Sequence, residues 1–287
     1  MRSALVFGGS GQIGRPLLAR LHRRGWQVHA VSRRAQPSMP GVQWLRGDLD
    51  SNEGLPARVD AIFSCGPLDH FARWYAQSTL ACPRVVAFGS TSIVVKQDSA
   101  DAEERDIAAR LREGECIVRE AADMRGAAAT LLRPTLIYGA AGDRTLTRIA
   151  TIAQRWRRFV LPRDATGLRQ PVHADDLAQA AFAVLDMAAT HGRAYALPGG
   201  EILPYREMVE RVLAVLQPPA SLHVVSPPLF LALLSLAHTA GIARGFSDAA
   251  SARMRHDLVF DIEPARLDFG YAPRPFQPTA AMFGAAR

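Results

Sequence analysis

A glycine-rich stretch close to the start of the chain constrains the fold most. An apolar run, Ala4 to Phe7, leads directly into Gly8-Gly9-Ser10-Gly11-Gln12-Ile13-Gly14, and an amphipathic segment continues to Arg24. This order predicts a strand, a tight turn and a helix. Glycines allow unusual backbone angles and a close approach to a pyrophosphate, whose charge a helix N-terminus favours. Although any tight strand-to-helix turn can use glycines, this context predicts the dinucleotide-binding turn of a Rossmann-type βαβ unit.

The end of the second predicted strand indicates which dinucleotide is bound. Residues 26–31 alternate toward a strand that ends at Ser32-Arg33-Arg34, about twenty residues after Gly14. An acidic residue here would accept a hydrogen bond from a ribose hydroxyl and favour NAD, whereas an arginine can pair with the 2′-phosphate of NADP. We therefore expect NADP, with NAD as the alternative, and assign the contact first to Arg33 and second to Arg34.

Apolar strands and helical segments alternate along the first half of the chain. Further strands are predicted at residues 42–45, 59–65 and 84–89, with helical segments such as residues 71–80 between them. This alternation predicts the α/β class, as a doubly wound parallel sheet with right-handed crossovers. Ligands bind beyond the carboxyl ends of the strands in such sheets, so four residues that follow strands are expected around one cleft: Asp48, Gly66, His70 and Ser90.

The second half of the chain predicts a smaller lobe. A long helix over residues 101–124 precedes a sixth strand, which Pro134 stops because it has no N–H to donate. Asp175 or Asp176 can cap the next helix, and the tail, residues 257–276, is expected to end in an irregular, rigid wrap at residues 271–276. We expect a dinucleotide-binding core over residues 1–139, to which residues 168–190 return, and a small substrate lobe over residues 140–167 and 191–287.

Composition argues against several classes of function. The net charge of +7 comes almost wholly from arginine, since Lys96 is the only lysine, but the arginines form no long basic run. Nucleic-acid binding is therefore not expected, and an anionic cofactor or substrate explains a local excess of arginine. Three cysteines without metal-ligand spacing indicate a reducing compartment and no metal site. The first strand begins almost at Met1 and leaves no room for a signal peptide, so we expect a cytoplasmic protein.

The expected partners are a small-molecule substrate and, in a homodimer, a second copy of the chain. The longest apolar stretch, residues 229–242, contains His238 and is too short for a typical membrane span, so stable membrane insertion is not expected. A helix of this composition is usually part of a core. The alternatives are a lining for a lipid, polyketide or isoprenoid substrate, or a contact with a membrane or a partner protein.

Together these motifs resemble the short-chain dehydrogenase/reductase superfamily in its extended or atypical branch, that of the nucleotide-sugar epimerases and dehydratases. The resemblance covers nearly the whole chain. The matching segments are the glycine turn with Gly8, Gly11 and Gly14, then Asp48-Leu49, Ser90-Thr91-Ser92, Arg133-Pro134 to Tyr138-Gly139, and residues 172–178. The resemblance implies that Asp48 and Leu49 flank the adenine, that Ser90 and Pro134 lie near the nicotinamide, and that a small C-terminal lobe closes over the substrate.

The usual proton donor of that superfamily is missing. Its members use a tyrosine followed four residues later by a lysine, whereas here the only lysine is Lys96 and the residue four before it is Ser92. The remaining candidates for chemistry are Ser90, Lys96 and His70, each of which can equally be a structural or solvated residue. By the resemblance, Arg169 would hold a substrate phosphate. The other candidates for substrate contacts are Thr91, Ser92 and Tyr138.

Two functions remain open at this point. The first is an NADP(H)-dependent oxidoreductase acting on a carbonyl, an alcohol or a nucleotide-sugar-like substrate. The second is a protein that binds NAD(P) without catalysis, as a structural or sensed ligand, and docks to a partner. The missing tyrosine and lysine favour the second function. Both functions need the glycine turn, so the cofactor site cannot separate them.

Overall fold

The computed structural model describes residues 1–51, 54–139, 145–239 and 252–283. The chain divides into two compact units. Unit 1 comprises Met1–Thr135, Val172–Pro198 and Asp261–Pro273, and unit 2 comprises Leu136–Pro171, Gly199–Phe260 and Arg274–Arg287. The predicted apolar stretch 229–242 and the predicted lobe boundary at residue 140 both run into residues outside the described ranges.

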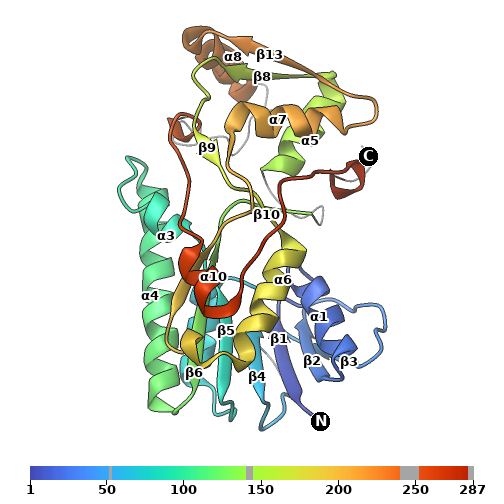
Figure 1. Cartoon of the computed structure of the whole chain (residues 1–287), viewed down its shortest axis with the longest axis vertical. Helices are drawn as coiled ribbons and strands as arrows, with labels where there is room; N and C mark the ends of the chain where they lie inside the picture. The colour runs from blue at the N-terminus through green and yellow to red at the C-terminus, as the bar shows by residue number, and fades with distance from the viewer. Residues whose placement is uncertain (52–53, 140–144, 240–251, 284–287) are drawn as a thin grey trace. The chain divides into compact units, whose positions relative to one another are not determined.

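Unit 1 is built on a seven-stranded sheet, which confirms the predicted α/β class (Figure 1). Every strand pair in it is parallel. The spatial order is β3-β2-β1-β4-β5-β6-β11, so the chain builds outward from β1 first in one direction and then in the other. The strands are β1 (Ser3–Phe7), β2 (Gln27–Ser32), β3 (Val42–Arg46), β4 (Ala61–Ser64), β5 (Arg84–Phe88), β6 (Ala128–Pro134) and β11 (Ala194–Leu197).

Helices cover both faces of this sheet. The connections β1–α1–β2 and β4–α2–β5 run in opposite directions along the sheet, so right-handed crossovers place α1 and α2 on opposite faces. Helix α1 packs with α6, and α2 packs with α4. β4 and β5 are buried along their whole length, as expected for parallel strands covered on both faces. The helices of unit 1 are α1 (Gly14–Arg23), α2 (Leu68–Gln77), α3 (Ser92–Val95), α4 (Ala102–Met124), α6 (Ala174–Ala183), η1 (Val184–Asp186), η2 (Ala188–Thr190) and α10 (Glu263–Phe269).

Of two predicted boundaries of elements in unit 1, one is confirmed and one is wrong. Strand β6 ends at Pro134, as predicted, and the carbonyl of Pro134 accepts from the N–H of Thr91 over 3.2 Å. Helix α6 is capped by His173, whose Nδ1 accepts from the N–H of Asp175 over 3.1 Å. Because the backbone of His173 is extended, its imidazole caps the helix in place of the carboxylate of Asp175 or Asp176, which was expected to do so.

The tail contains a helix, α10, that was not predicted, ahead of residues 271–276, which have no regular secondary structure, as predicted. Helix α10 ends at Gly270, which adopts the left-handed conformation with a φ of 70°. Phe269 packs edge-on against Tyr195 of β11 with ring centroids 5.2 Å apart, and the Tyr195 hydroxyl donates to Asp268 over 2.6 Å. This helix forms because contacts to a distant edge strand bury one side of it.

Unit 2 contains the parallel pair β8–β13 and the antiparallel pair β9–β12. Its apolar core includes residues of α5, α7, β8 and η3. Its elements are β7 (Ile137–Tyr138), α5 (Leu146–Trp156), β8 (Arg158–Pro162), β9 (Leu168–Arg169), β12 (Leu203–Pro204), α7 (Tyr205–Ala214), β13 (Ser221–Val225), α8 (Pro227–Thr239) and η3 (Ala280–Phe283).

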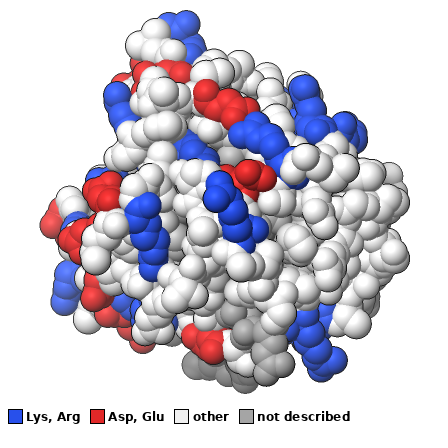
Figure 2. All heavy atoms as spheres, turned by 90° about the horizontal axis from the view of Figure 1, so that it is seen from below, with Lys and Arg blue, Asp and Glu red and all other residues white. Residues whose placement is uncertain are grey.

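Two properties of the molecular surface bear on partners. Among the described residues, no helix has both the length and the apolar composition needed to cross a membrane. On the face shown in Figure 2, Lys and Arg side chains are interspersed with Asp and Glu side chains. Among the described residues on that face, the basic side chains do not gather into a single patch.

Candidate functional site

The turn between β1 and α1 leaves no space for a side chain at Gly8 or Gly14. Gly8 has a φ of 73°, and a Cβ there would lie 2.8 Å from the carbonyl carbon of Cys65, which follows β4. A Cβ on Gly14 would lie 2.2 Å from the carbonyl oxygen of Gly8. Gly11 closes the turn, because its N–H donates to the same oxygen over 2.9 Å. The first turn of α1 therefore lies directly against the end of β1, as a dinucleotide-binding turn requires.

The N-terminus of α1 suits phosphate groups. Ile13 at the N-cap is buried and makes no capping hydrogen bond, and the first turn contains no acidic residue. The first N–H groups of a helix lack an intrahelical acceptor, and the helix dipole favours an anion beside them. Gln12 Oε1 is buried without a hydrogen-bond partner in the described part of the chain, which suits a hydroxyl donor such as a ribose. The backbone from Ser10 to Gly14 therefore fits the predicted pyrophosphate.

Arg33 is exposed directly after β2, and no hydrogen bond or ion pair to it is found within the described ranges. Ser32 holds the backbone around it: the Ser32 hydroxyl donates to the carbonyl of Arg34 over 2.8 Å and accepts from the amide of Gln36 over 3.2 Å. A fixed backbone with a free guanidinium is what bidentate recognition of a phosphate needs. Arg34 is also exposed and remains the second candidate.

Asp48 follows β3 and is held as a carboxylate. Its Oδ1 accepts from the N–H groups of Ser51 over 2.8 Å and Asp50 over 3.0 Å. These two backbone hydrogen bonds lower the pKa of Asp48, and the charges of Arg33 and His70 lower it further. The adjacent Leu49 lines a surface cavity of about 410 Å³ together with residues of α2. A charged acceptor beside an apolar side chain suits the amino group and ring of an adenine, as the resemblance implies.

Gly66 and His70 follow β4 on the way into α2. A Cβ on Gly66 would have no heavy atom within 4 Å, so the backbone there borders open space. The Nδ1 atom of His70 lies 3.7 Å from Asp50 Oδ2, and this ring also acts on the carboxylate of Asp48. The structure therefore groups His70 with Asp48 and Asp50, where the resemblance implies the adenine, and this favours a role there over the predicted role in catalysis.

The carboxyl ends of β5 and β6 meet at Ser90, Thr91 and Pro134, the residues expected near the nicotinamide. The Thr91 hydroxyl donates to the carbonyl of Pro134 over 3.1 Å and is therefore occupied. The Ser90 hydroxyl accepts from the N–H of Ser92 over 3.1 Å. An acceptor for the proton of Ser90 is not found among the described residues, so that proton is free to bind a substrate oxygen.

Lys96 lies at the C-terminal end of α3, one turn after Ser92. Its Nζ lies 3.4 Å from Oε1 of Glu104 on α4, and that carboxylate is buried. The hydroxyl of Ser99 donates to the other oxygen of Glu104 over 2.9 Å. This pairing fastens α3 to α4, and it favours a structural role for the only lysine over the predicted role as a proton donor.

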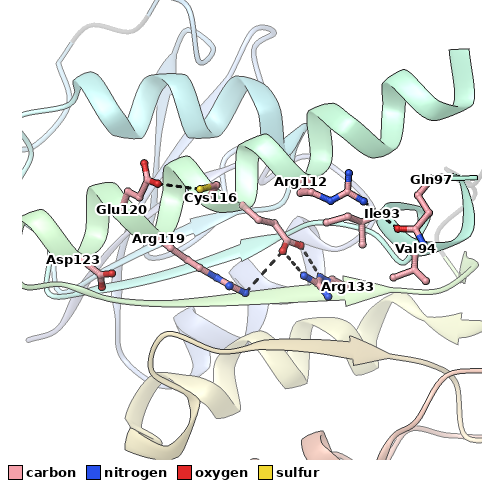
Figure 3. A pocket seen from close by; sticks show the side chains of 10 residues that line it. Ile93, Val94, Gln97, Arg112, Cys116, Arg119, Glu120, Asp123 and Arg133 are labelled. Carbon is pink, nitrogen blue, oxygen red and sulfur yellow. Dashed lines mark hydrogen bonds and ion pairs between the residues drawn. The ribbon is translucent and has the colours of Figure 1, made fainter. Parts of the chain in front are cut away.

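The sequence did not single out Glu115 as the partner of Arg133. Two parallel hydrogen bonds join Arg133 of β6 to Glu115 of α4 and raise the pKa of Arg133, while Arg119 lies 4.0 Å from the same carboxylate (Figure 3). This ion pair fastens α4 to the end of β6 one residue before Pro134. It borders a surface cavity of about 540 Å³. The available sequence signal was an arginine before Pro134 and a glutamate on a helix, 18 residues apart.

Tyr138 and Arg169, predicted to bind substrate, are both engaged within unit 2. Tyr138 is fully buried, donates to the carbonyl of Pro275 over 3.2 Å and packs edge-on against Phe276. Arg169 is 5% exposed and donates to the carbonyls of three residues, Leu168, His256 and Arg253. These contacts favour structural roles for both side chains. No group of three potential metal ligands occurs within the described ranges.

Comparisons with known proteins agree with this geometry. A model of the NAD dependent epimerase/dehydratase family matches residues 4–82 and 78–197. The 2-alkyl-3-oxoalkanoate reductase of Stenotrophomonas maltophilia is 27% identical over 312 residues, which cover 94% of each protein.

Two solved structures share the fold at lower identity. The terminal R domain from the myxalamid PKS-NRPS biosynthetic pathway has a TM-score of 0.73 at 18% identity, over 98% of this chain and 88% of that domain. The UDP-glucuronic acid 4-epimerase of Bacillus cereus, bound to UDP-glucuronic acid and NAD, has a TM-score of 0.68 at 12% identity, over 98% of this chain and 96% of the epimerase.

Proposed function

The chain belongs to the NAD dependent epimerase/dehydratase family, and we propose that it is an NADP(H)-dependent oxidoreductase that reduces the ketone of an acyl substrate. The observation that carries this proposal is the Ser90 hydroxyl. It stands at the carboxyl end of β5 beside Pro134, and its proton has no acceptor among the described residues. The three cysteines form no disulfide, which is usual in a reducing compartment, and we therefore propose a cytoplasmic location.

The cofactor would be held along the carboxyl ends of the strands. The turn from Gly8 to Gly14 would bind the pyrophosphate, Arg33 the 2′-phosphate, and Asp48 with Leu49 the adenine. When bound, the reduced nicotinamide supplies the hydride that a carbonyl carbon accepts. Ser90 would donate a hydrogen bond to the carbonyl oxygen, on which negative charge develops. The proton that completes the alcohol would come from solvent through Ser90, since Lys96 is paired with Glu104.

The hydrogen bonds of Arg169 bear on the class of substrate. A nucleotide sugar carries a diphosphate, and the arginine expected to hold it is buried and donates to three backbone carbonyls. The relative from Stenotrophomonas maltophilia is named for a 2-alkyl-3-oxoalkanoate. We propose the same class, a 3-oxo carboxylic acid with an alkyl chain, ahead of a nucleotide sugar.

The cofactor part of the proposal is tested by calorimetric titration. NADPH is expected to bind more tightly than NADH, and Arg33→Ala is expected to remove most of the preference. Hydrogen bonds between charged groups contribute about 1.5–3 kcal/mol each, so the expected loss is about tenfold to 100-fold. Arg58→Ala is the matched control, because Arg58 is an exposed arginine on the amino side of β4. Equal affinities of the unchanged protein for NADPH and NADH would contradict the assignment.

The catalytic part is tested by following NADPH oxidation with a 2-alkyl-3-oxoalkanoate. Ser90→Ala is expected to lower kcat by about 100-fold, as for the loss of one donor to a developing oxyanion, while the NADPH affinity stays unchanged. The missing tyrosine and lysine support a second candidate, a protein that binds NAD(P) without catalysis. Tight NADPH binding without oxidation by any 3-oxo acid would favour this second candidate.

A further inference from the structure

Helix α8 of unit 2 has an unusual surface for a protein with no membrane span among its described residues. Its sequence, residues 227–239, contains no Asp, Glu, Lys or Arg. Four of its leucines are widely exposed: Leu229 by 50%, Leu231 by 47%, Leu233 by 40% and Leu236 by 67%. A helix that is apolar all round is normally buried in a protein or in lipid. Exposure of such a helix therefore marks an interaction surface.

Within the described residues, one side of α8 packs inside unit 2. Phe230 is buried and Leu234 is half-buried, and the helix contacts β8. Leu161 of β8 belongs to the unit's core and Phe159 packs against it, together with residues of α5 and α7, whereas no described residue of α8 belongs to that core. Leu229, Leu233 and Leu236 follow the i, i+4, i+7 spacing and so form one exposed stripe. We call this stripe of three leucines the leucine surface; Leu231 is exposed on another side of the helix.

Unpaired positive charge occurs at both ends of the neighbouring strand β8. Arg157 and Arg158 stand at its start and Arg163 directly after its end, and all three are exposed. The N–H of Arg163 donates to the carbonyl of Val225 over 2.8 Å, two residues before α8 begins. In the described part of the chain, none of the three arginines has a carboxylate oxygen within ion-pair distance. The positive charges of these three arginines are therefore not neutralised by carboxylates of the described residues.

An exposed aromatic ring adds to this basic surface. Trp156, at the end of α5, is 47% exposed, and the guanidinium of Arg155 lies 5.5 Å from the centroid of its ring. Tryptophan and arginine together are typical of side chains at the headgroup level of a bilayer. Exposed leucines, unpaired arginines and a half-exposed tryptophan in one unit match the composition of surfaces that lie in a membrane interface.

We propose that the leucine surface docks unit 2 onto an anionic lipid bilayer, with Arg158 and Arg163 contacting the headgroups. At about 1.5 Å per residue, the 13 residues of α8 extend about 20 Å, which is less than the hydrocarbon thickness of about 30 Å. The helix therefore lies in the interface instead of crossing it. Negative headgroups complement the unpaired arginines, whereas an acidic protein partner would not account for a stripe of three exposed leucines.

Vesicle flotation with the full chain tests this proposal. Vesicles of equal parts phosphatidylglycerol and phosphatidylcholine are expected to carry the protein, whereas vesicles of phosphatidylcholine alone are expected to carry much less. The double variant Leu233→Ser/Leu236→Ser is expected to lower partitioning roughly tenfold or more, because two leucines no longer enter the apolar layer. The double variant Arg158→Gln/Arg163→Gln is expected to lower it as well, and added salt should weaken binding of the unchanged protein.

Leu267→Ser is the matched control, because Leu267 is a 73% exposed leucine on α10 in unit 1. Its partitioning should equal that of the unchanged protein, and all variants should keep the same melting temperature. Absence of binding to the anionic vesicles, or equal losses in the control and the Leu233/Leu236 variant, would overturn the proposal. A dimer in sedimentation that the Leu233/Leu236 variant dissociates, without vesicle binding, would instead assign the surface to a second copy of the chain.

Discussion

Gly14→Ala is the substitution to which the glycine turn should respond most strongly. The new Cβ would lie 2.2 Å from the carbonyl oxygen of Gly8 and 2.6 Å from the Cα of Gly9. Ordinary contact needs more than 3 Å, so the start of α1 must move by about 1 Å. Both neighbours are backbone atoms, and no flexible side chain can give way instead. The N–H groups that face the pyrophosphate move with the helix.

The expected magnitude follows from the hydrogen bonds that this shift breaks. A hydrogen bond to a charged group contributes about 1.5–3 kcal/mol, so losing one weakens binding by roughly 10-fold to 150-fold in Kd, and losing two weakens it further. The assay is calorimetric titration with NADPH. Gly11→Ala should have a smaller effect, since its Cβ would lie 3.1 Å from the Gly8 oxygen.

A remote glycine provides the control for backbone effects. Gly126 has a φ of 61° and no atom within 4 Å of a built Cβ, so Gly126→Ala should cost about 1 kcal/mol of stability and leave NADPH binding unchanged. Gly14→Ala should also lose stability, by about 1–3 kcal/mol, because the turn is overpacked. A Gly14→Ala protein that binds NADPH with unchanged affinity would refute the phosphate-turn interpretation.

Three further predictions concern stability and reactivity. Arg84→Met should lower the free energy of unfolding by about 3 kcal/mol or more, since buried carbonyls lose their hydrogen-bond donor. The NADPH affinity should stay unchanged because Arg84 lies at the amino end of β5. Urea titrations measure the first effect and calorimetry the second. Hydrogen bonds from the first residue of β1 lower the folded pKa of Asp60, so its contribution to stability is complete above about pH 4 and is lost as the pH falls further. Asp60→Asn should therefore flatten the acid side of a stability profile measured by chemical denaturation; an unchanged slope would contradict this. Cys116 is exposed, whereas burial raises the pKa of Cys65 to about 12 and that of Cys82 to about 11. A thiol reagent should therefore react with one cysteine in the native protein and with three after unfolding. Fast reaction of all three cysteines in the native protein would contradict this prediction.

The elements of the Rossmann sheet could be predicted because their signals are local. The apolar run before Gly8 and the glycine spacing define β1, the turn and α1 within a few residues. The polar residues after each strand, such as Asp48 and Ser90, could be placed at one edge because parallel strands share their carboxyl ends. No distant contact was needed for these inferences.

The details that sequence reasoning missed depend on which side chains pair in the folded chain. Glu115 binds Arg133 across 18 residues, and Lys96 finds a buried partner on the next helix. Helix α10 forms against Tyr195, more than 60 residues earlier. His173 caps α6 through an imidazole, a group that capping preferences do not emphasise. Periodicity and spacing carry no information about such pairings.

A crystal structure of the chain grown with NADPH tests the central claim most directly. The pyrophosphate should lie against the N–H groups at the start of α1, between Gly8 and Gly14, and the 2′-phosphate should lie within hydrogen-bond distance of Arg33. Pyrophosphate density away from this turn, or a 2′-phosphate that faces solvent while Arg33 stays apart from it, would contradict the proposed NADP(H) site.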